Sequence, residues 1–157
     1  MSDTDEAPVD PQAAAWSKHA PELVRYATLL VGPDDAPDVV ARAFQRVMAA
    51  PLDRVRELRA YLFRAVTNAA TDQHRSTRRR QIRDLHALLP EILHEQETML
   101  DIRRAVAGLS VQQRSVIYFT YWEDLDANQI ARILAISPDS VRRHLARARV
   151  HLRKALQ

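Results

Sequence analysis

The spacing of apolar residues constrains the fold of this chain more than any other feature of its sequence. Along residues 35–49, for example, Val39, Ala43 and Val47 recur every four positions and Phe44 lies beside Ala43, as on one face of an α-helix. The same spacing predicts helices over about 12–31, 35–49, 57–79, 101–107, 110–122, 127–134 and 138–156. Because no stretch alternates like a β-strand and only two of 157 residues are glycine, the predicted fold class is all-α.

Charge is distributed in blocks along the sequence. Residues 1–10 carry four acidic residues and residues 84–101 carry five, and neither block contains a base. The bases concentrate in residues 73–83, which contain five arginines and no acid, and in residues 137–157, which contain six bases and one acid. This alternation predicts two basic surfaces joined by an acidic connector.

Several kinds of site are not expected from this composition. The chain has no cysteine, which excludes disulfides and thiolate metal sites. Its six histidines form no His-x-x-x-His pair, so we expect neither a metal nor another cofactor. Nothing marks an activated nucleophile, so we do not expect an enzyme. The acidic start lacks the pattern of a secretion signal, and no run approaches the ~18 apolar residues that span a membrane. We therefore expect a cytoplasmic protein without membrane contact.

Residues 127–156 have the pattern of a helix-turn-helix motif. Asp126 is placed to cap a short first helix, and Ser137, followed by Pro138, is placed to cap a longer second helix. Between them, Ala135 occupies a turn position at which such motifs often have glycine, because the turn needs a positive φ. An alanine held in that conformation should cost about 1 kcal/mol.

The second helix of this motif combines a buried stripe with an exposed basic side. Val141, Leu145 and Ala148 form the stripe, which leaves the arginines facing outward. A recognition helix meets base edges and phosphates through such a surface, so we predict binding to duplex DNA. The predicted contact residues are Ser137, Asp139, Ser140, Arg142, Arg143, His144 and Arg147. The alternative is a solvated amphipathic helix whose charges have no specific partner.

Two aromatic residues are expected in the core. Tyr121 and Trp122 lie in the segment YFTYWEDL, at helical spacing among apolar neighbours. This context favours packing inside the fold over a platform on which bases stack. Tyr61 is expected in the core for the same reason.

Three segments, in order, resemble the sigma-70 family of bacterial transcription initiation factors, and in particular its extracytoplasmic function (ECF) group. DAPDVVARAFQRVM (35–48) looks like the region 2 motif that binds the clamp helices of RNA polymerase. AYLFRAVTNAATDQHRSTRRR (60–80) looks like the segment that opens and reads the −10 promoter element. Residues 109–156 look like region 4, which reads the −35 element. The resemblance implies two small helical domains joined by a linker.

The resemblance also implies roles for individual residues. Those implied to hold the opened −10 strand are Arg64, Asn68, Asp72, Arg75, Arg78 and Arg79. Asp72 would orient Arg75 or Arg79 by an ionic hydrogen bond. Those implied to face the polymerase are Asp35, Asp38, Val39, Arg42, Phe44 and Arg46, with core packing as the alternative for Phe44. The loop at residues 50–57 matches the segment that captures a flipped −10 base, and its lack of an aromatic residue leaves polar and backbone groups for that capture.

Domain boundaries and partners follow from the same resemblance. An acidic N-terminus (1–10) would precede a region 2-like domain (11–80), an acidic linker (81–100) and a region 4-like domain (101–157). Because Pro90 interrupts residues 81–100, the linker is compatible with a docked helix or an extended connection, and it would thread towards the polymerase active-site cleft. The implied partners are core RNA polymerase, through its clamp helices and flap, promoter DNA and, where one exists, an anti-sigma factor. The free protein is expected to be a monomer.

Departures from the family pattern keep two other functions open. Ala41–Arg42 stands where Gln-Glu is frequent, and Pro37 stands where glutamate is common. A reversed charge at this surface would weaken polymerase binding or alter its control. One alternative is a conventional helix-turn-helix regulator that binds a palindrome as a dimer, with residues 10–100 as a dimerisation or sensor domain. The other is a sigma-like interaction protein that binds polymerase or a regulator without starting transcription.

Overall fold

The structure, a computed structural model, describes residues 10–84 and 97–157, with side chains described for residues 10–75 and 101–157. Its elements are α1 (Pro11–Val31), α2 (Ala36–Ala49), the 3-10 turn η1 (Leu52–Arg54), α3 (Leu58–Asp84), α4 (Glu97–Ala107), α5 (Val111–Ile117), the π-helical turn η2 (Tyr118–Trp122), α6 (Ala127–Leu134) and α7 (Pro138–Ala155). The described residues contain no strand, which confirms the predicted all-α class. Residues 1–9 of the predicted acidic N-terminus and residues 85–96 of the predicted linker lie outside the described residues.

The first three helices pack against one another and form the N-terminal half of the fold, residues 10–84. Asp10 caps α1 by accepting a hydrogen bond from the backbone N–H of Gln12 (2.9 Å), and the helix continues through Pro21. Gly32 ends it with a φ of 87°, a left-handed conformation that glycine adopts without strain. The apolar face of α2 is then buried against α1 and α3, as its periodicity predicts.

The helix-turn-helix in the C-terminal half, residues 97–157, has the local structure that the sequence predicts. Asp126 accepts hydrogen bonds from the backbone N–H of Asn128 (2.8 Å) and Gln129 (2.9 Å) at the start of α6. Ser137 accepts one from the backbone N–H of Ser140 (3.1 Å) at the start of α7. Between them, Ala135 has the expected left-handed conformation, with φ 55° and ψ 45°.

The prediction that Tyr121 and Trp122 lie in the core is wrong. Both rings are largely exposed, and Tyr118 and Phe119 are buried instead. Both residues lie in the π-helical turn η2, which has more residues per turn than an α-helix, so α-helical spacing does not give the direction of their side chains. Tyr121 lies against Arg149, whose Nε donates to the Tyr121 hydroxyl (2.8 Å).

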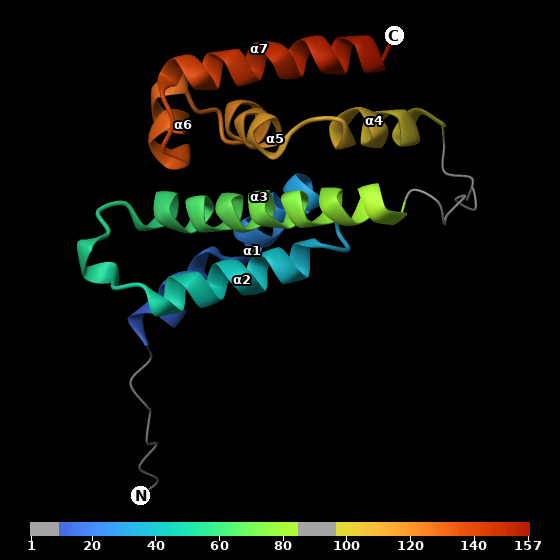
Figure 1. Cartoon of the computed structure of the whole chain (residues 1–157). Helices are drawn as coiled ribbons and strands as arrows, with labels where there is room; N and C mark the ends of the chain where they lie inside the picture. The colour runs from blue at the N-terminus through green and yellow to red at the C-terminus, as the bar shows by residue number, and fades with distance from the viewer. Residues whose placement is uncertain (1–9, 85–96) are drawn as a thin grey trace, which may run out of the picture.

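The two halves share one continuous core. In Figure 1, α3 lies between α1 and α2 on one side and the helices of the C-terminal half on the other. Tyr26 and Phe63 from the N-terminal half pack against Tyr118 and Phe119 from the C-terminal half, with ring centroids 4.9–6.2 Å apart. Burial of large aromatic rings dominates the energetics of such a contact, so the halves are held together by apolar packing first. Within the described residues, no helix has the length and apolarity to cross a bilayer.

Candidate nucleic-acid interface

The first turn of α7 presents a set of side chains that hold one another in place. Asp139 Oδ1 accepts a hydrogen bond from Arg142 Nη1 (2.6 Å), and Ser140 Oγ accepts one from Arg143 Nη2 (3.0 Å). The hydroxyl oxygens of Ser137 and Ser140 lie 2.9 Å apart. These contacts place two arginine forks beside a helix N-terminus, where the backbone N–H groups also attract anions.

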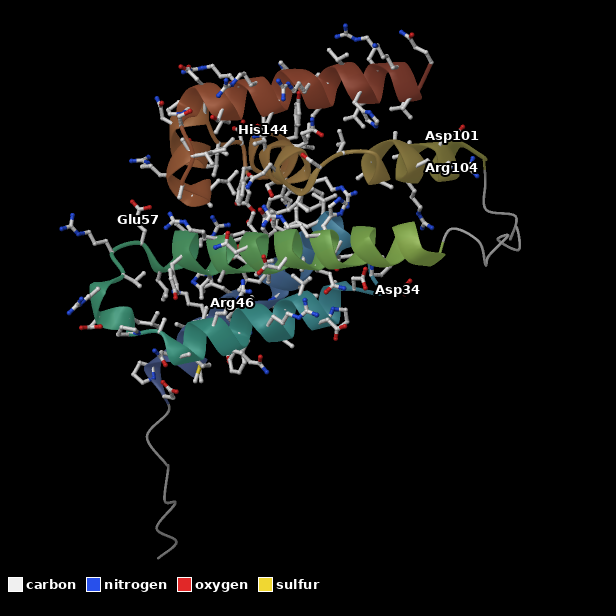
Figure 2. The ribbon with its side chains drawn as sticks, in the orientation of Figure 1. Asp34, Arg46, Glu57, Asp101, Arg104 and His144 are labelled. Carbon is white, nitrogen blue, oxygen red and sulfur yellow. The ribbon has the colours of Figure 1, made fainter. Side chains whose placement is uncertain are left out.

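The remaining predicted contact residues on α7 lie on the same side. Arg147 is exposed, whereas His144 is half-buried (Figure 2). Burial lowers the pKa of His144 below 6.5, and the charges of Arg147 and Arg143 lower it further. The imidazole is therefore neutral near pH 7. One ring nitrogen can donate a hydrogen bond to a base edge, and the other can accept one from it. The structure thus brings all seven predicted residues of this surface together on one helix and its cap.

The predicted −10 residues follow α3 at helical spacing. Asn68, Asp72 and Arg75 are exposed, and together with Arg64 they mark one side of the helix. The side chains of Arg78 and Arg79 lie outside the described residues. The Oδ2 atom of Asp72 accepts a hydrogen bond from Arg46 Nη2 of α2 (2.6 Å) rather than from Arg75, the other candidate partner, Arg79, having no described side chain.

Arg64 is half-buried and hydrogen-bonded to α6. Its Nε donates to the carbonyl oxygen of Ile133 (3.1 Å) and its Nη2 to that of Arg132 (2.7 Å), both in the last turn of α6. The last carbonyls of a helix have no partner within it and carry the negative end of the helix dipole, so a cation binds them favourably. Sequence reasoning placed Arg64 on DNA and did not foresee this partner, which lies 68 and 69 positions away.

The residues predicted to face the polymerase divide into two groups. Asp38, Arg42 and Arg46 are exposed on α2, and Figure 2 shows Arg46 on the side of the molecule opposite to His144 of α7. Val39 is fully buried, so its side chain supports the core of the N-terminal half. Phe44 is partly buried and packs edge-on against Trp16, with centroids 5.3 Å apart, in line with the core-packing alternative. Asp35 is half-buried at the start of α2.

A hollow of about 450 Å³ lies beside the loop at residues 50–57. Arg54, Arg56 and Arg64 line it from the N-terminal half, and Arg132 lines it from α6. Glu57 is the one acidic residue in its lining, so the hollow favours a polyanion such as a nucleic-acid backbone. Sequence reasoning singled out the loop but not Arg132, because nothing local in the sequence brings α6 to this position.

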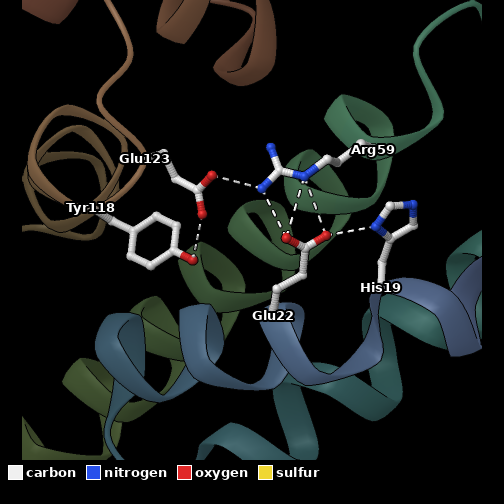
Figure 3. Close-up of polar contacts among 5 residues, drawn as sticks. All are labelled: His19, Glu22, Arg59, Tyr118 and Glu123. Carbon is white, nitrogen blue, oxygen red and sulfur yellow. Dashed lines mark hydrogen bonds and ion pairs between the residues drawn. The ribbon is translucent and has the colours of Figure 1, made fainter.

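Glu22, Arg59 and Glu123 form an ionic cluster between the two halves (Figure 3). Arg59 Nη2 lies 2.9 Å from Glu22 Oε2 and 2.8 Å from Glu123 Oε2, and Glu22 Oε1 lies 2.6 Å from His19 Nδ1. Burial would raise the pKa of Glu22, but the hydrogen bonds and charges of Arg59 and His19 outweigh it and hold that pKa below 4.5. The guanidinium of Arg59 also lies 4.7 Å from the centroid of the Phe63 ring.

Arg114 on α5 is a second cation that joins the halves. It is buried and donates to the carbonyl oxygens of Leu30 at the end of α1, Ala107 at the end of α4 and Leu109. Burial lowers the pKa of Arg114, but an arginine stays protonated under all ordinary conditions. This role could not be predicted from the sequence, because arginine is seldom buried and is therefore expected on the surface.

Comparison with known proteins identifies the same two units that the resemblance suggested. A model of sigma-70 region 2 matches residues 15–80, and a model of sigma-70 region 4 matches residues 99–152.

The described residues contain no group of three His, Cys, Asp or Glu side chains that could hold a metal ion.

Similar proteins are found among both curated sequences and solved structures. The ECF RNA polymerase sigma factor SigL of Mycobacterium tuberculosis strain H37Rv is 32% identical over 155 residues, covering 92% of this chain and 88% of SigL. The sigma factor RpoE of Bartonella quintana, solved in complex with the anti-sigma factor NepR, superimposes with a TM-score of 0.65 at 23% identity, covering 91% of this chain and 94% of the other. PhyRSL of Sphingomonas sp. Fr1, also solved with NepR, gives a TM-score of 0.63 at 17% identity, covering 92% of this chain and 88% of the other. These two structures share the fold.

Proposed function

The chain belongs to the ECF sigma factors of the sigma-70 family, and we propose that it directs RNA polymerase to promoters by reading a −35 duplex with α7 and an opened −10 strand with α3. The observation that carries this assignment is the ordered arginine surface at the start of α7, combined with a second polar surface on α3 in the same chain. A conventional helix-turn-helix regulator has no need of a second nucleic-acid surface. The match of residues 15–80 to region 2 supports the sigma function over that alternative.

The −35 surface would combine base contacts and phosphate contacts. Arg142, Arg143 and His144 lie near the N-terminal half of α7, where a recognition helix enters the major groove. Arginine forks recognise guanine edges through two parallel hydrogen bonds, so these residues would supply sequence preference. Arg147 lies one turn further along and would neutralise phosphate.

The −10 surface would be divided between α3 and the adjoining loop. Asn68 has donor and acceptor groups that fit the Watson–Crick edge of an unstacked base. Arg75, Arg78 and Arg79 would contact the phosphates of the opened strand, and the hollow beside residues 50–57 would take a flipped base. The region 2-like unit would then span residues 11–80 and the region 4-like unit residues 101–157, joined by an acidic linker at residues 81–100.

Polymerase binding would use the exposed side of α2. Asp38, Arg42 and Arg46 lie there, next to the −10 surface, as expected if one helix docks on the polymerase clamp while the next holds DNA. The sigma factor RpoE and PhyRSL were both solved with the anti-sigma factor NepR, and an anti-sigma protein is therefore a proposed partner here as well. The protein would act in the cytoplasm as a monomer when free, without catalysis of its own.

Transcription in vitro tests the proposal. The purified chain is added to bacterial core polymerase and a library of genomic promoter fragments, and the 5′ ends of the transcripts are mapped. Discrete starts that depend on the added chain are expected. Binding to core polymerase without transcripts would instead identify a sigma-like interaction protein, in line with the exposed Arg42 at a position where the family often has an acidic residue. The absence of both core-polymerase binding and transcripts would overturn the proposed function.

A further inference from the structure

Asp139 is the one acidic residue in residues 137–157, which contain six bases. It lies in the first turn of α7, and its side chain is 84% exposed. A carboxylate on a surface that faces a polyanion lowers affinity for DNA of any sequence, because it repels the phosphates. An acid at the start of a recognition helix therefore has to provide something other than affinity.

The start of α7 does not need Asp139 as a cap. Ser137 Oγ accepts a hydrogen bond from the backbone N–H of Ser140 (3.1 Å), and Pro138 occupies the first turn, where no N–H donor is needed. A carboxylate in the first turn also interacts favourably with the helix dipole. That interaction depends on charge alone, so it acts equally on every DNA sequence.

Asp139 and Arg142 present an acceptor and several donors side by side. Asp139 Oδ1 accepts a hydrogen bond from Arg142 Nη1 (2.6 Å), and the Arg142 side chain is 60% exposed. In the described part of the chain, Oδ2 of Asp139 has no hydrogen-bond partner. A guanidinium has five N–H donors, so Arg142 can hold Asp139 and contact a base at the same time. Because both side chains are exposed, the pair adds little to folding.

The major-groove edge of a C·G base pair matches this arrangement. Cytosine N4 offers a donor to a carboxylate, and guanine O6 and N7 offer two acceptors to an arginine fork. Guanine or thymine next to Asp139 offers it no donor, and a carboxylate that loses water without gaining a donor is unfavourable. Adenine has a donor at N6, but its thymine partner offers Arg142 a single acceptor, O4.

From this geometry we propose that Asp139 is a specificity-determining residue of the −35 surface, which selects one C·G base pair together with Arg142. Asp139 accepts a hydrogen bond from cytosine N4, and Arg142 donates to O6 and N7 of the paired guanine. The inference rests on the proposed sigma function and adds one base pair of defined identity to it. Asp139 thus weakens binding to DNA in general and confines tight binding to sites that contain this pair.

Selection of duplex DNA by the assembled polymerase tests the proposal. The full chain is combined with bacterial core polymerase and incubated with promoter-length duplexes whose upstream segment is randomised, and the bound sequences are read. The native chain is compared with Asp139→Ala and Asp139→Asn. The matched control is Asp101→Asn, which removes an exposed carboxylate from α4, away from the first turn of α7 (Figure 2).

Each variant has its own expected result. The native chain should prefer a C·G pair at one −35 position by about tenfold or more over the other pairs. Asp139→Ala should lose that preference alone and bind non-matching duplexes more tightly, because the repulsive charge is gone. Asp139→Asn should switch the preference at that position to adenine, since an amide recognises adenine N6 and N7 together. The control variant should select the native sequence.

Two results would overturn the proposal while leaving the proposed function in place. One is a native −35 preference that both Asp139 variants keep at every position. The other is an Asp139→Ala variant that binds all duplexes more weakly by the same factor, as expected if the carboxylate only supports the helix dipole. If the native chain selects no shared −35 sequence, the proposed function itself fails, and the inference falls with it.

Discussion

Arg46 of α2 and Asp72 of α3 form an ion pair in which Nη2 and Oδ2 lie 2.6 Å apart. The family pattern assigns Arg46 to the polymerase surface and Asp72 to the −10 surface, so the pair connects two proposed binding surfaces. Both side chains are about half exposed, at 46% and 51%. The pair therefore orients the two groups more than it stabilises the fold.

We predict that Arg46→Gln lowers the free energy of unfolding by less than about 1 kcal/mol, because exposed ion pairs contribute little. The same change should weaken binding to core polymerase. Chemical denaturation and titration with labelled core polymerase measure the two effects. Asp72→Asn is the matched control: it breaks the same ion pair and should spare polymerase binding. Equal loss of polymerase binding in both variants would refute the assignment of Arg46.

Arg114→Met should be the most destabilising change among those considered. Methionine keeps much of the side-chain volume but leaves the carbonyl oxygens of Leu30, Ala107 and Leu109 without this donor. Buried acceptors that lose their partners cost about 1–3 kcal/mol each, so we expect a loss of roughly 3 kcal/mol in the free energy of unfolding. Arg104→Met, at an exposed site on α4, should change it by less than about 0.5 kcal/mol. Similar values for both variants would contradict the role of Arg114.

Ala135→Gly should stabilise the helix-turn-helix. Ala135 has a φ of 55°, a conformation that costs an L-residue roughly 1–2 kcal/mol and glycine almost nothing. Glycine also has greater freedom in the unfolded chain, which offsets part of this gain. We therefore expect the free energy of unfolding, measured by thermal or chemical denaturation, to rise by about 0.5–1 kcal/mol. Ala146→Gly, at an exposed position inside α7, should have the opposite sign and cost about 1 kcal/mol. A destabilised Ala135→Gly variant would count against the left-handed turn.

Acid should weaken the fold partly through Glu22. Its pKa is held below 4.5 in the folded state, so the charged carboxylate stabilises the fold at pH values above the pKa of Glu22 in the unfolded chain. This contribution is lost as the pH falls below 4.5 and through the folded-state pKa. Glu22→Gln should therefore flatten the pH dependence of the unfolding free energy in that range. Asp139→Asn, which removes an exposed carboxylate on α7, controls for the change in net charge. Parallel pH curves for the native chain and Glu22→Gln would exclude the proposed contribution.

Binding of duplex DNA should depend on Arg143 and on salt. Arg143→Ala should lower affinity for a −35 duplex by about tenfold or more if the fork contacts a base edge. If Arg143 contacts a phosphate instead, the slope of log affinity against log salt should fall by about 1. Fluorescence anisotropy at several salt concentrations measures both quantities. Arg104→Ala, which removes an exposed arginine on α4, is the control. If it lowers DNA affinity as much as Arg143→Ala does, the α7 surface is not the specific DNA-binding site.

The local structure of this protein is predictable from its sequence because its signals are local. Asp126 and Ser137 lie directly before the helices that they cap, and the positive φ of Ala135 follows from its place between them. Apolar periodicity likewise located the helices, although α3 extends to Asp84, past the predicted end near residue 79. Helix ends are the least reliable part of such predictions.

What the sequence did not predict depends on residues far apart in the chain. Arg59 meets Glu22 and Glu123 across 37 and 64 positions, and no periodicity links them. The partners of Arg64 are backbone carbonyls, which any residue could supply, so no side-chain pattern identifies them. Trp122 lies in the π-helical turn η2, which departs from α-helical periodicity, and helical spacing therefore misplaced that ring.

The most direct test of the central claim compares promoter sequences selected by the native chain and two variants. Transcript starts are mapped with core polymerase and a promoter library for the native chain, Arg143→Ala and Asn68→Ala. Our account predicts shared −35 and −10 sequences for the native chain, a relaxed −35 preference for Arg143→Ala and a relaxed −10 preference for Asn68→Ala. Unchanged preferences in both variants, or no discrete starts with the native chain, would contradict it.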